Sequence, residues 1–316
     1  MRNKALVVGS IVYDEIFTIH GNIKDEIPLE DGSIKAINLM FTARNRTRYF
    51  GGTAGNIAYG LGQTGETPLL FSCVGSDFEP YYIDHLRNNG IEPRVFNAGR
   101  EHFTATFYGI SDEAGQQIGI FQPNAYGHYV NKIPLAETLS DKDFDNVKVA
   151  IFSPGTGTST LRHVREVKKK TKGRAITILD PGQELSVSFG KGILEEAMAL
   201  VDMVIVNEVE MAQLNNLFGL TPEKIHHIGP KTIIETKGDQ GAVIMVGDKS
   251  IQVQAYKAPS VMEATGAGDA FRAGLIKGLL NDWDIQRAAR LAARLGALSV
   301  AYRGGQGYAL DDAPDS

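Results

Sequence analysis

The chain has 316 residues, of which 43% are apolar and 22% are charged. This composition predicts a globular protein with a sizeable core, built as one large α/β domain with a smaller appendage or as two modest domains. The formal net charge of −5 argues against a protein that coats nucleic acid, because such proteins carry a basic surface.

Nothing in the sequence predicts secretion or membrane insertion. The single cysteine, Cys73, lies in an apolar run and cannot form an internal disulfide, which is typical of cytosolic proteins. The N-terminal apolar run is too short for a signal peptide, and no apolar stretch reaches 18 residues. We therefore expect a cytoplasmic protein with neither a nucleic acid nor a membrane as partner.

Apolar runs typical of buried strands alternate along the chain with helical patterns. The expected strands are 5–8, 148–152, 175–180, 203–207 and 232–236, and the expected helices are 159–172, 190–200, 208–218 and 270–280. This alternation predicts an α/β fold with a doubly wound, mostly parallel sheet flanked by helices. Ligands bind beyond the carboxyl ends of such strands. Asp14, Ser153, Asp180, Asn207 and Thr236 are expected there.

Two segments interrupt the alternation. Residues 15–49 and 97–126 contain polar–apolar stretches, at 34–39, 103–110 and 117–121, that predict antiparallel strands. We expect them to form a small β-sheet lid across the mouth of the cleft. The expected core then comprises residues 1–14, 50–96 and 127–316.

The lid also carries three alternating arginines, Arg44, Arg46 and Arg48, which would share one face of a strand. A charged, solvated edge strand is the favoured interpretation. Phosphate contact and a subunit interface are the alternatives, and an exposed lid edge could support a homodimer.

The most informative motif is the segment 263–274, where a glycine-rich turn opens a helix. Unpaired N–H groups at a helix start attract anions, and glycines let a ligand approach them closely. Our hypothesis is that Gly266, Ala267 and Gly268 hold developing phosphoryl charge while Asp269 takes a proton from a hydroxyl. The alternative is an ordinary loop-to-helix junction in which the aspartate is the N-cap.

A second glycine turn, 51–56, also opens an expected helix. Gly52 would let a substrate lie against the main chain, and Asn56 would bind its hydroxyls. Asp14 follows Ser10 closely, and a carboxylate there could accept two hydrogen bonds from a vicinal diol such as that of ribose. The alternatives are a packing turn and a surface aspartate.

Two strand ends carry groups suited to a nucleotide and its metal. Asn207 and Glu210 open a helix directly after a strand, and Glu210 is a candidate Mg²⁺ partner acting through water. An acidic cluster at a helix start is the alternative. Thr236, Lys237, Gly238 and Gly241 could contact phosphates, or could simply form a hairpin turn.

Together the motifs at 50–58, 207–210, 235–241 and 263–274 resemble the PfkB or ribokinase-like family of small-molecule kinases over nearly the whole chain. The segments 74–78, 180–183 and 271–274 are most similar to bacterial adenosine and other nucleoside kinases. The resemblance implies a ribokinase-like fold, ATP as phosphoryl donor and Mg²⁺. Members often hold a monovalent cation near the last motif, which here begins with Glu263 in place of the usual aspartate.

The acceptor is expected to be a nucleoside. Phe107 and Phe121 in the lid could stack on a purine, Gln183 could meet the base or a hydroxyl, and lid packing is the alternative role for the rings. Arg272, three residues beyond Asp269, could clamp a phosphate or only pair with a nearby carboxylate.

The predicted function is ATP-dependent phosphorylation of a nucleoside 5′-hydroxyl, with adenosine the favoured acceptor and purine salvage the corresponding role. Two alternatives stay open: a sugar kinase for ribose or a related sugar, and a non-catalytic nucleotide or nucleoside sensor on the same fold.

Overall fold

The computed structural model describes residues 3–27 and 39–310. Its main element is a nine-stranded sheet with the order β15-β14-β13-β12-β11-β10-β1-β4-β6. The strands are β1 (Lys4–Val8), β4 (Leu69–Phe71), β6 (Glu92–Pro93), β10 (Val147–Phe152), β11 (Ile176–Leu179), β12 (Met203–Asn207), β13 (Thr232–Thr236), β14 (Ala242–Val246) and β15 (Lys249–Val253). The strands from β6 to β13 pair in parallel, and only β14 and β15 are antiparallel.

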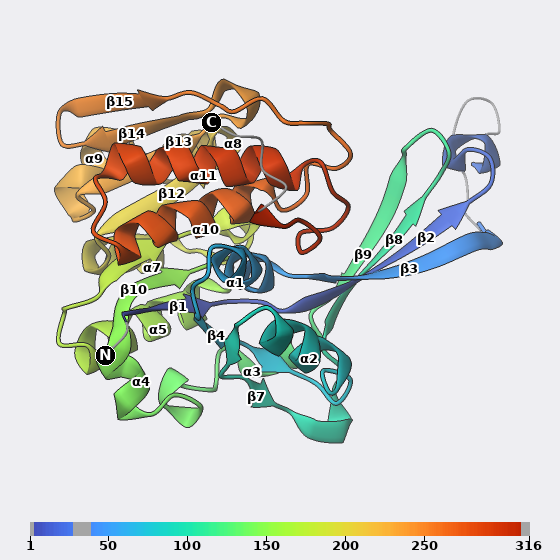
Figure 1. Ribbon diagram of the computed structural model, residues 1–316, viewed down its shortest axis with the longest axis horizontal. Helices are drawn as coiled ribbons and strands as arrows, with labels where there is room; N and C mark the ends of the chain where they lie inside the picture. The colour runs from blue at the N-terminus through green and yellow to red at the C-terminus, as the bar shows by residue number, and fades with distance from the viewer. Residues whose placement is uncertain (1–2, 28–38, 311–316) are drawn as a thin grey trace.

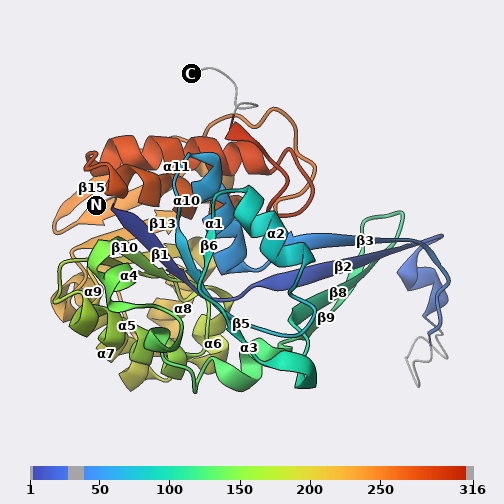
Figure 2. The same ribbon diagram turned by 60° about the horizontal axis from the view of Figure 1, so that its bottom comes forward.

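Helices cover both faces of this sheet (Figure 2). One face packs against α1 (Thr53–Gln63), α2 (Tyr81–Asn88), α10 (Ala267–Leu280) and α11 (Ile285–Ser299). The other packs against α3 (Asn124–Tyr129), α4 (Asp141–Asn146), α5 (Gly157–Lys170), α6 (Leu185–Ser188), α7 (Lys191–Leu200), α8 (Glu208–Phe218) and α9 (Pro222–Ile228). The buried strand residues therefore face one of two apolar cores, which confirms the predicted doubly wound α/β fold.

The expected elements were close to those observed. The helix expected at 208–218 is α8, and the one expected at 159–172 begins two residues earlier because the Thr156 side chain caps Ser159 N at 3.2 Å. α10 begins at Ala267 rather than at residue 270, so the glycine-rich turn itself enters the helix. Short 3₁₀ turns were not anticipated; they are η1 (Ile23–Glu26), η2 (Gly99–Glu101), η3 (Leu135–Glu137), η4 (Gly182–Glu184) and η5 (Gly238–Gln240).

The lid is a separate four-stranded sheet with the order β3-β2-β8-β9, which reaches away from the core as an arm (Figure 1). Its strands are β2 (Val12–Ile19), β3 (Ala43–Gly51), β8 (Ala105–Ser111) and β9 (Gln117–Gln122). The expectation of purely antiparallel strands was wrong for the central pair: β2 and β8 are parallel, because both leave the core in the same direction and β3 and β9 return. Most of the stretch expected at 34–39 lies outside the described residues.

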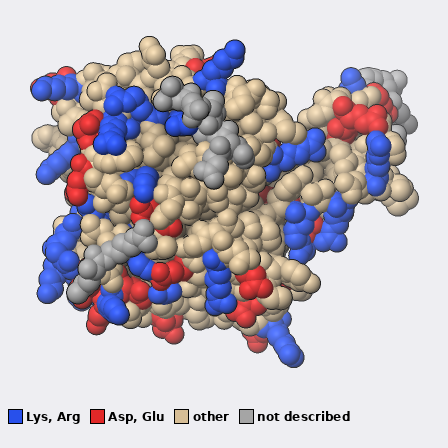
Figure 3. Space-filling model, viewed as in Figure 1, with Lys and Arg blue, Asp and Glu red and all other residues tan. Residues whose placement is uncertain are grey.

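The arginines of β3 have a partner on the neighbouring strand. Glu15 is only 1% exposed, and its carboxylate accepts from Arg46 Nε at 2.7 Å and from the Arg48 guanidinium. Hydrogen bonding to Arg46 and Arg48 lowers the pKa of Glu15. The edge strand is therefore charged and solvated, as favoured from the sequence, but two of its cations compensate a buried anion. Figure 3 shows Lys and Arg side chains along the underside of this arm, whereas both signs of charge are interspersed over the core.

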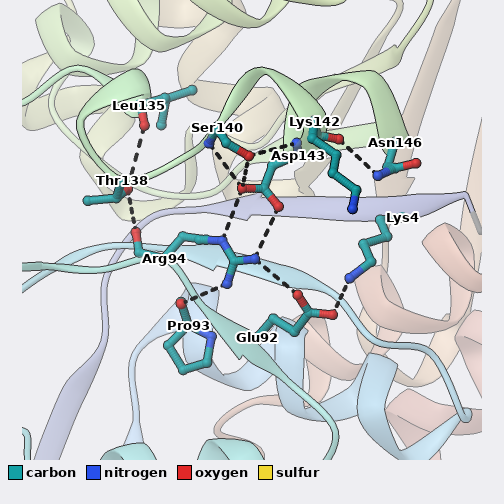
Figure 4. Close-up of polar contacts among 10 residues, drawn as sticks. All are labelled: Lys4, Glu92, Pro93, Arg94, Leu135, Thr138, Ser140, Lys142, Asp143 and Asn146. Carbon is teal, nitrogen blue, oxygen red and sulfur yellow. Dashed lines mark hydrogen bonds and ion pairs between the residues drawn. The ribbon is translucent and has the colours of Figure 1, made fainter.

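The far end of the large sheet is fastened by polar contacts. A short two-stranded sheet of β5 (Cys73–Val74) and β7 (Phe96–Asn97) lies next to it. Arg94 donates to Asp143 Oδ1 and to Glu92 Oε2, at 3.1 Å each, and Lys4 pairs with Glu92, so β6 is tied to α4 and β1 (Figure 4). Among the described residues, no helix combines the length and the apolarity that a membrane crossing requires.

Candidate active site

A polar cavity of about 370 Å³ lies beyond the carboxyl ends of the parallel strands, between the core and the lid. It gathers every residue that the sequence assigned to the acceptor, together with the proposed base and metal partner. These residues are Ser10, Asp14, Gly52, Asn56, Phe107, Phe121, Gln183, Asn207, Glu210, Asp269 and Arg272. Residues from distant parts of the chain therefore meet at one end of the sheet, as doubly wound folds require.

A second, mainly apolar cavity of about 730 Å³ lies on the other side of the α10 N-terminus. Three of the residues predicted to contact the nucleotide line it: Thr236, Gly238 and Gly241. Lys237 does not line it, because its ammonium pairs with Glu235 Oε2 at 3.4 Å. Its other walls come from the start of α10, from α11 and from the segment 255–261. The last of these carries no motif and could not be identified from the sequence.

The start of α10 separates the two cavities. Ala267 and Gly268 line the apolar cavity, whereas Asp269 lines the polar one. Gly266 has φ of +84°, and a Cβ there would lie 2.8 Å from Gly305 Cα, so both conformation and space require glycine. The turn therefore places the first N–H groups of a helix between two cavities. The N–H of Ala267 also donates to Ala264 O at 3.2 Å, so its hydrogen is already shared.

Asp269 faces the polar cavity and is not held in an ion pair. Its Oδ2 accepts from Asn56 Nδ2 at 2.8 Å. Burial of the carboxyl group raises the pKa of Asp269 to about 7, against the opposing effects of Arg272 and Asn56. The residue keeps part of its surface exposed toward the cavity, so a ligand hydroxyl could reach it. A carboxylate with this pKa can accept a proton near neutral pH.

Arg272 is buried and pairs with a carboxylate, the second of the two roles considered for it. Its Nη2 lies 2.6 Å from Asp180 Oδ1, and its Nη1 donates to Gly268 O at 3.0 Å. The phosphate contact stays a prediction, since the guanidinium also lines the polar cavity. Asp180 was placed at a strand end by the sequence, but no pattern indicated its partner 92 positions away.

Asp14 stands in a row of side chains that crosses the lid. In the strand registers Asp14 lies opposite Phe107, and Phe107 lies opposite Phe121, so the three share the face toward the cavity. A Cβ on Gly51 would lie 2.2 Å from Asp14 Oδ2, so glycine makes room for this carboxylate. Burial, followed by the charges of Glu263 and Asp269, raises the pKa of Asp14 to about 7.

Asn207 and Glu210 form a capping box at the start of α8. Glu210 Oε2 accepts from Asn207 N at 2.9 Å, and Glu210 N donates to Asn207 Oδ1 at 2.8 Å. This geometry agrees with the structural alternative, a helix start, while both side chains line the polar cavity. Burial and the charge of Asp180 raise the pKa of Glu210. Glu263, which replaces the usual aspartate, accepts from Gly304 N at 3.1 Å.

Comparison with known proteins identifies the family and the fold. Residues 5–312 match the profile described as pfkB family carbohydrate kinase. The nucleoside kinase of Methanocaldococcus jannaschii is 28% identical over 305 residues, 96% of this chain and 92% of that protein. Its crystal structure has a TM-score of 0.83 at 25% identity, over 97% of this chain and 94% of that one.

Two further solved structures are similar. Burkholderia thailandensis nucleoside kinase in complex with inosine has a TM-score of 0.77 at 30% identity, over 96% of this chain and 93% of that one. A ribokinase from Thermotoga maritima has a TM-score of 0.76 at 21% identity, over 96% of this chain and 95% of that one, which shows a shared fold.

The chain therefore belongs to the pfkB family of carbohydrate kinases and has the ribokinase-like fold. It is an ATP-dependent phosphotransferase that acts on a hydroxyl group.

Proposed function

We propose that this protein transfers the γ-phosphoryl group of ATP to the 5′-hydroxyl of a purine nucleoside, with adenosine as the favoured acceptor. The observation that carries the proposal is the position of Asp269: its carboxyl group, free of Arg272, opens into the polar cavity opposite the lid phenylalanines. The name shared by the relatives, nucleoside kinase, and the inosine complex of the Burkholderia enzyme support a nucleoside over a free sugar.

In the proposed reaction Asp14 accepts hydrogen bonds from the ribose diol, and Phe107 and Phe121 stack on the base. The nucleoside O5′ attacks the γ-phosphorus while its proton moves to Asp269, the new O–P bond forms, and the bond to the β-phosphate oxygen breaks to release ADP. The N–H groups of Gly266, Ala267 and Gly268 stabilise charge on the transferred group; that of Ala267 exchanges its acceptor from Ala264 O to the phosphoryl oxygen.

We expect Mg²⁺ in the same cavity. Glu210 and Asn207 line it together with Asp180, whose carboxylate is paired with Arg272, and burial, followed by the charge of Asp180, raises the pKa of Glu210. We expect Glu210 to hold the ion through water, and when bound the ion would neutralise charge on the phosphates. Thr236, Gly238 and Gly241 would contact the nucleotide in the apolar cavity. Lys237 would first have to leave Glu235.

A panel assay tests the proposal directly. Release of ADP from ATP is measured with adenosine, inosine, cytidine, ribose and fructose as acceptors, and the product is identified by mass spectrometry. We expect the highest kcat/KM with adenosine and phosphate on O5′. Turnover of ribose with no turnover of any nucleoside would instead establish a sugar kinase, and binding of a nucleoside without turnover would establish a sensor.

We also propose a cytoplasmic homodimer that forms through the outer lid face, the side of the lid sheet opposite the polar cavity. This face carries Phe17, Ile19, Tyr108, Ile110, Ile118 and Ile120 around a shallow groove of about 240 Å³. Ile120 is 63% exposed. An apolar patch on a soluble enzyme is typical of a protein interface, and a second copy of the same face would cover it.

A further inference from the structure

The segment that follows α11 passes beside the glycine turn at the start of α10, although no sequence motif marks it. Gln306 in this segment is only 8% exposed, and it lies 250 positions from Asn56 along the chain. Its amide Nε2 donates to Asn56 Oδ1 at 3.1 Å and to the Tyr82 hydroxyl oxygen at 2.8 Å. Its Oε1 lies 2.9 Å from Nε2 of His85. Both ends of this buried amide therefore have partners.

These contacts fix which way the Gln306 amide points. The Tyr82 hydroxyl donates its hydrogen to Gly51 O at 2.5 Å, so its oxygen is left to accept from Gln306. Burial lowers the pKa of His85, so its ring is neutral near pH 7, and with the Gln306 amide in this orientation the tautomer that carries its hydrogen on Nε2 donates to Gln306 Oε1. The reversed amide would place two acceptors together at Asn56 and a carbonyl oxygen against the Tyr82 oxygen, whose hydrogen goes to Gly51 O.

The orientation of the Gln306 amide also determines the orientation of the Asn56 amide. Because Asn56 Oδ1 accepts from Gln306, its Nδ2 is the atom that faces Asp269 Oδ2, at 2.8 Å. An Asn56 amide turned by half a rotation would put a carbonyl oxygen against the carboxylate. Gly305 also packs against this amide, since a Cβ there would lie 2.4 Å from Asn56 Cγ. Gly305 and Gln306 thus fix the Asn56 side chain, and Asn56 in turn donates to Asp269.

We propose that Gln306 is a positioning residue for phosphoryl transfer: by donating to Asn56 Oδ1 it makes Asn56 Nδ2 donate to Asp269, which keeps that carboxylate aimed at the acceptor hydroxyl. The inference rests on the function proposed above. Gln306 lines neither cavity, so it acts on the reaction through its neighbours, and of these Asn56 is the one that contacts Asp269.

The proposal makes a pH-dependent prediction. The charged and titratable groups around Asp269 are Arg272 on its own helix, Asp180 beyond β11, Asp14 on β2 and Tyr308 after α11. Gln306 has no hydrogen bond to any of these four groups; the titratable side chains that it does contact are Tyr82 and His85 on α2. Loss of the Asn56 N–H donor removes a contact that favours the ionised carboxylate, so the pKa of Asp269 rises. A base with a raised pKa needs a higher pH to be ionised, so the acid limb of the kcat profile moves to higher pH.

The principal variant is Gln306→Met, which removes both polar ends without adding charge. We expect the pH at half-maximal kcat to rise by about one unit, with kcat recovering at alkaline pH and KM for ATP unchanged. The ionised carboxylate of Gln306→Glu can accept hydrogen bonds but cannot donate one to Asn56, so this variant should raise the pH at half-maximal kcat further. His85→Phe keeps the ring beside Phe50 but removes the donor to Gln306, and should give a smaller shift in the same direction. It replaces Gln306→Met if that variant does not fold.

The chain offers a matched control in Gln63→Met. Gln63 Nε2 also donates to an asparagine oxygen, Asn89 Oδ1 at 3.0 Å, at the far end of the same helix as Asn56. This variant should keep the wild-type pH profile. If kcat of Gln306→Met falls equally at every pH, or if the profile does not move, Gln306 is only a structural residue and the proposal is overturned.

A second measurement does not depend on turnover. The Asp269 carboxyl group is titrated by carbon-13 NMR in the ligand-free protein, with its signal assigned by loss in Asp269→Asn. The proposal requires a higher pKa in Gln306→Met than in the wild type or Gln63→Met, and equal values would overturn it. If the wild-type protein phosphorylates no nucleoside, the proposed function fails, while this titration still decides the role of Gln306.

Discussion

Asp269 and Arg272 stand one helical turn apart at the start of α10, yet the Arg272 guanidinium turns to Asp180, with Nη2 2.6 Å from Oδ1 and Nε 2.5 Å from Oδ2. The arginine thereby leaves the Asp269 carboxyl group to Asn56. A carboxylate held by a neutral amide keeps more basicity than one held by a guanidinium, because an adjacent cation lowers its pKa. The Asp180 carboxylate therefore keeps the guanidinium away from Asp269, the proposed base.

Replacing Asp180 should expose this relationship. In Asp180→Asn the buried Arg272 loses its counter-ion, so we expect the free energy of unfolding to fall by about 3 kcal/mol. The freed guanidinium would turn to Asp269, lower its pKa and reduce kcat. Urea unfolding and steady-state rates measure the two effects. In the double variant Asp180→Asn/Arg272→Met most of the stability should return, because no unpaired charge is left buried. If Asp180→Asn alone unfolds with the wild-type free energy, the ion pair of Asp180 and Arg272 does not stabilise the fold as proposed.

Asp269→Asn should separate binding from chemistry. The amide keeps the shape of the side chain but cannot accept the O5′ proton, so kcat should fall by at least ~10²-fold while KM for both substrates changes little. Initial rates and isothermal titration with the nucleoside provide the two readouts. Asp248→Asn, on an exposed turn, is the control. Full turnover by Asp269→Asn would remove Asp269 from the role of base.

The carboxylates of the cavity should also make stability depend on pH. The pKa values of Asp14 and Asp269 are raised to about 7 by burial, compared with about 4 in an unfolded chain. The folded protein therefore binds more protons than the unfolded chain between these values, and the stability from these groups is lost as the pH rises through about 7. Asp14→Asn should raise Tm by about 2 °C or more at pH 8 and by less at pH 5.

Calorimetry at both pH values, without ligand, measures this difference. Asp248→Asn again serves as the control, since it lies outside the cavity. An Asp14→Asn variant that gains the same Tm at pH 5 and pH 8 would show that the effect is not one of ionisation. The prediction also implies that Asp14, the proposed diol ligand, lowers the stability of the ligand-free protein at pH 8.

The motif residues were predictable because their roles depend on local backbone. Glycine turns followed by a helix placed Gly52, Asn56, Gly266 and Asp269, and the alternation of strands and helices placed them all at one end of the sheet. The resemblance of the whole motif order to the pfkB family predicted the fold and the reaction. In each case the signal lay within about ten consecutive residues.

What the sequence could not show depends on contacts between distant segments. Gln306 meets Asn56 across 250 positions and Asp180 meets Arg272 across 92, with no periodicity to indicate either pair. The wall at 255–261 is irregular backbone whose position is set by its neighbours. The parallel pairing of β2 with β8 is likewise a choice between non-local partners, which strand patterns leave undetermined.

The lid phenylalanines should determine the preference for a base. Phe121 is 51% exposed and lines the polar cavity, so Phe121→Ala removes a stacking surface without opening the core. We expect KM for adenosine to rise by about 10-fold or more, with KM for ATP unchanged. Gln117→Ala, at the far end of the same strand, is the control. An unchanged KM for adenosine would assign Phe121 to lid packing alone.

The outer lid face gives the last prediction. Ile118 and Ile120 are 39% and 63% exposed on the side of β9 opposite Phe121, beside Tyr108 and Phe17. If a second copy covers this face, the wild-type protein should elute as a dimer in light scattering coupled to gel filtration. Ile118→Lys/Ile120→Lys should then give a monomer, because each lysine would lose its hydration inside the interface. Gln117→Lys adds charge at the end of the same strand and should remain dimeric. A monomeric wild type at 100 µM protein (about 3 mg/mL for this 34.3 kDa chain) would refute the interface, and a dimer that survives both lysines would place it elsewhere.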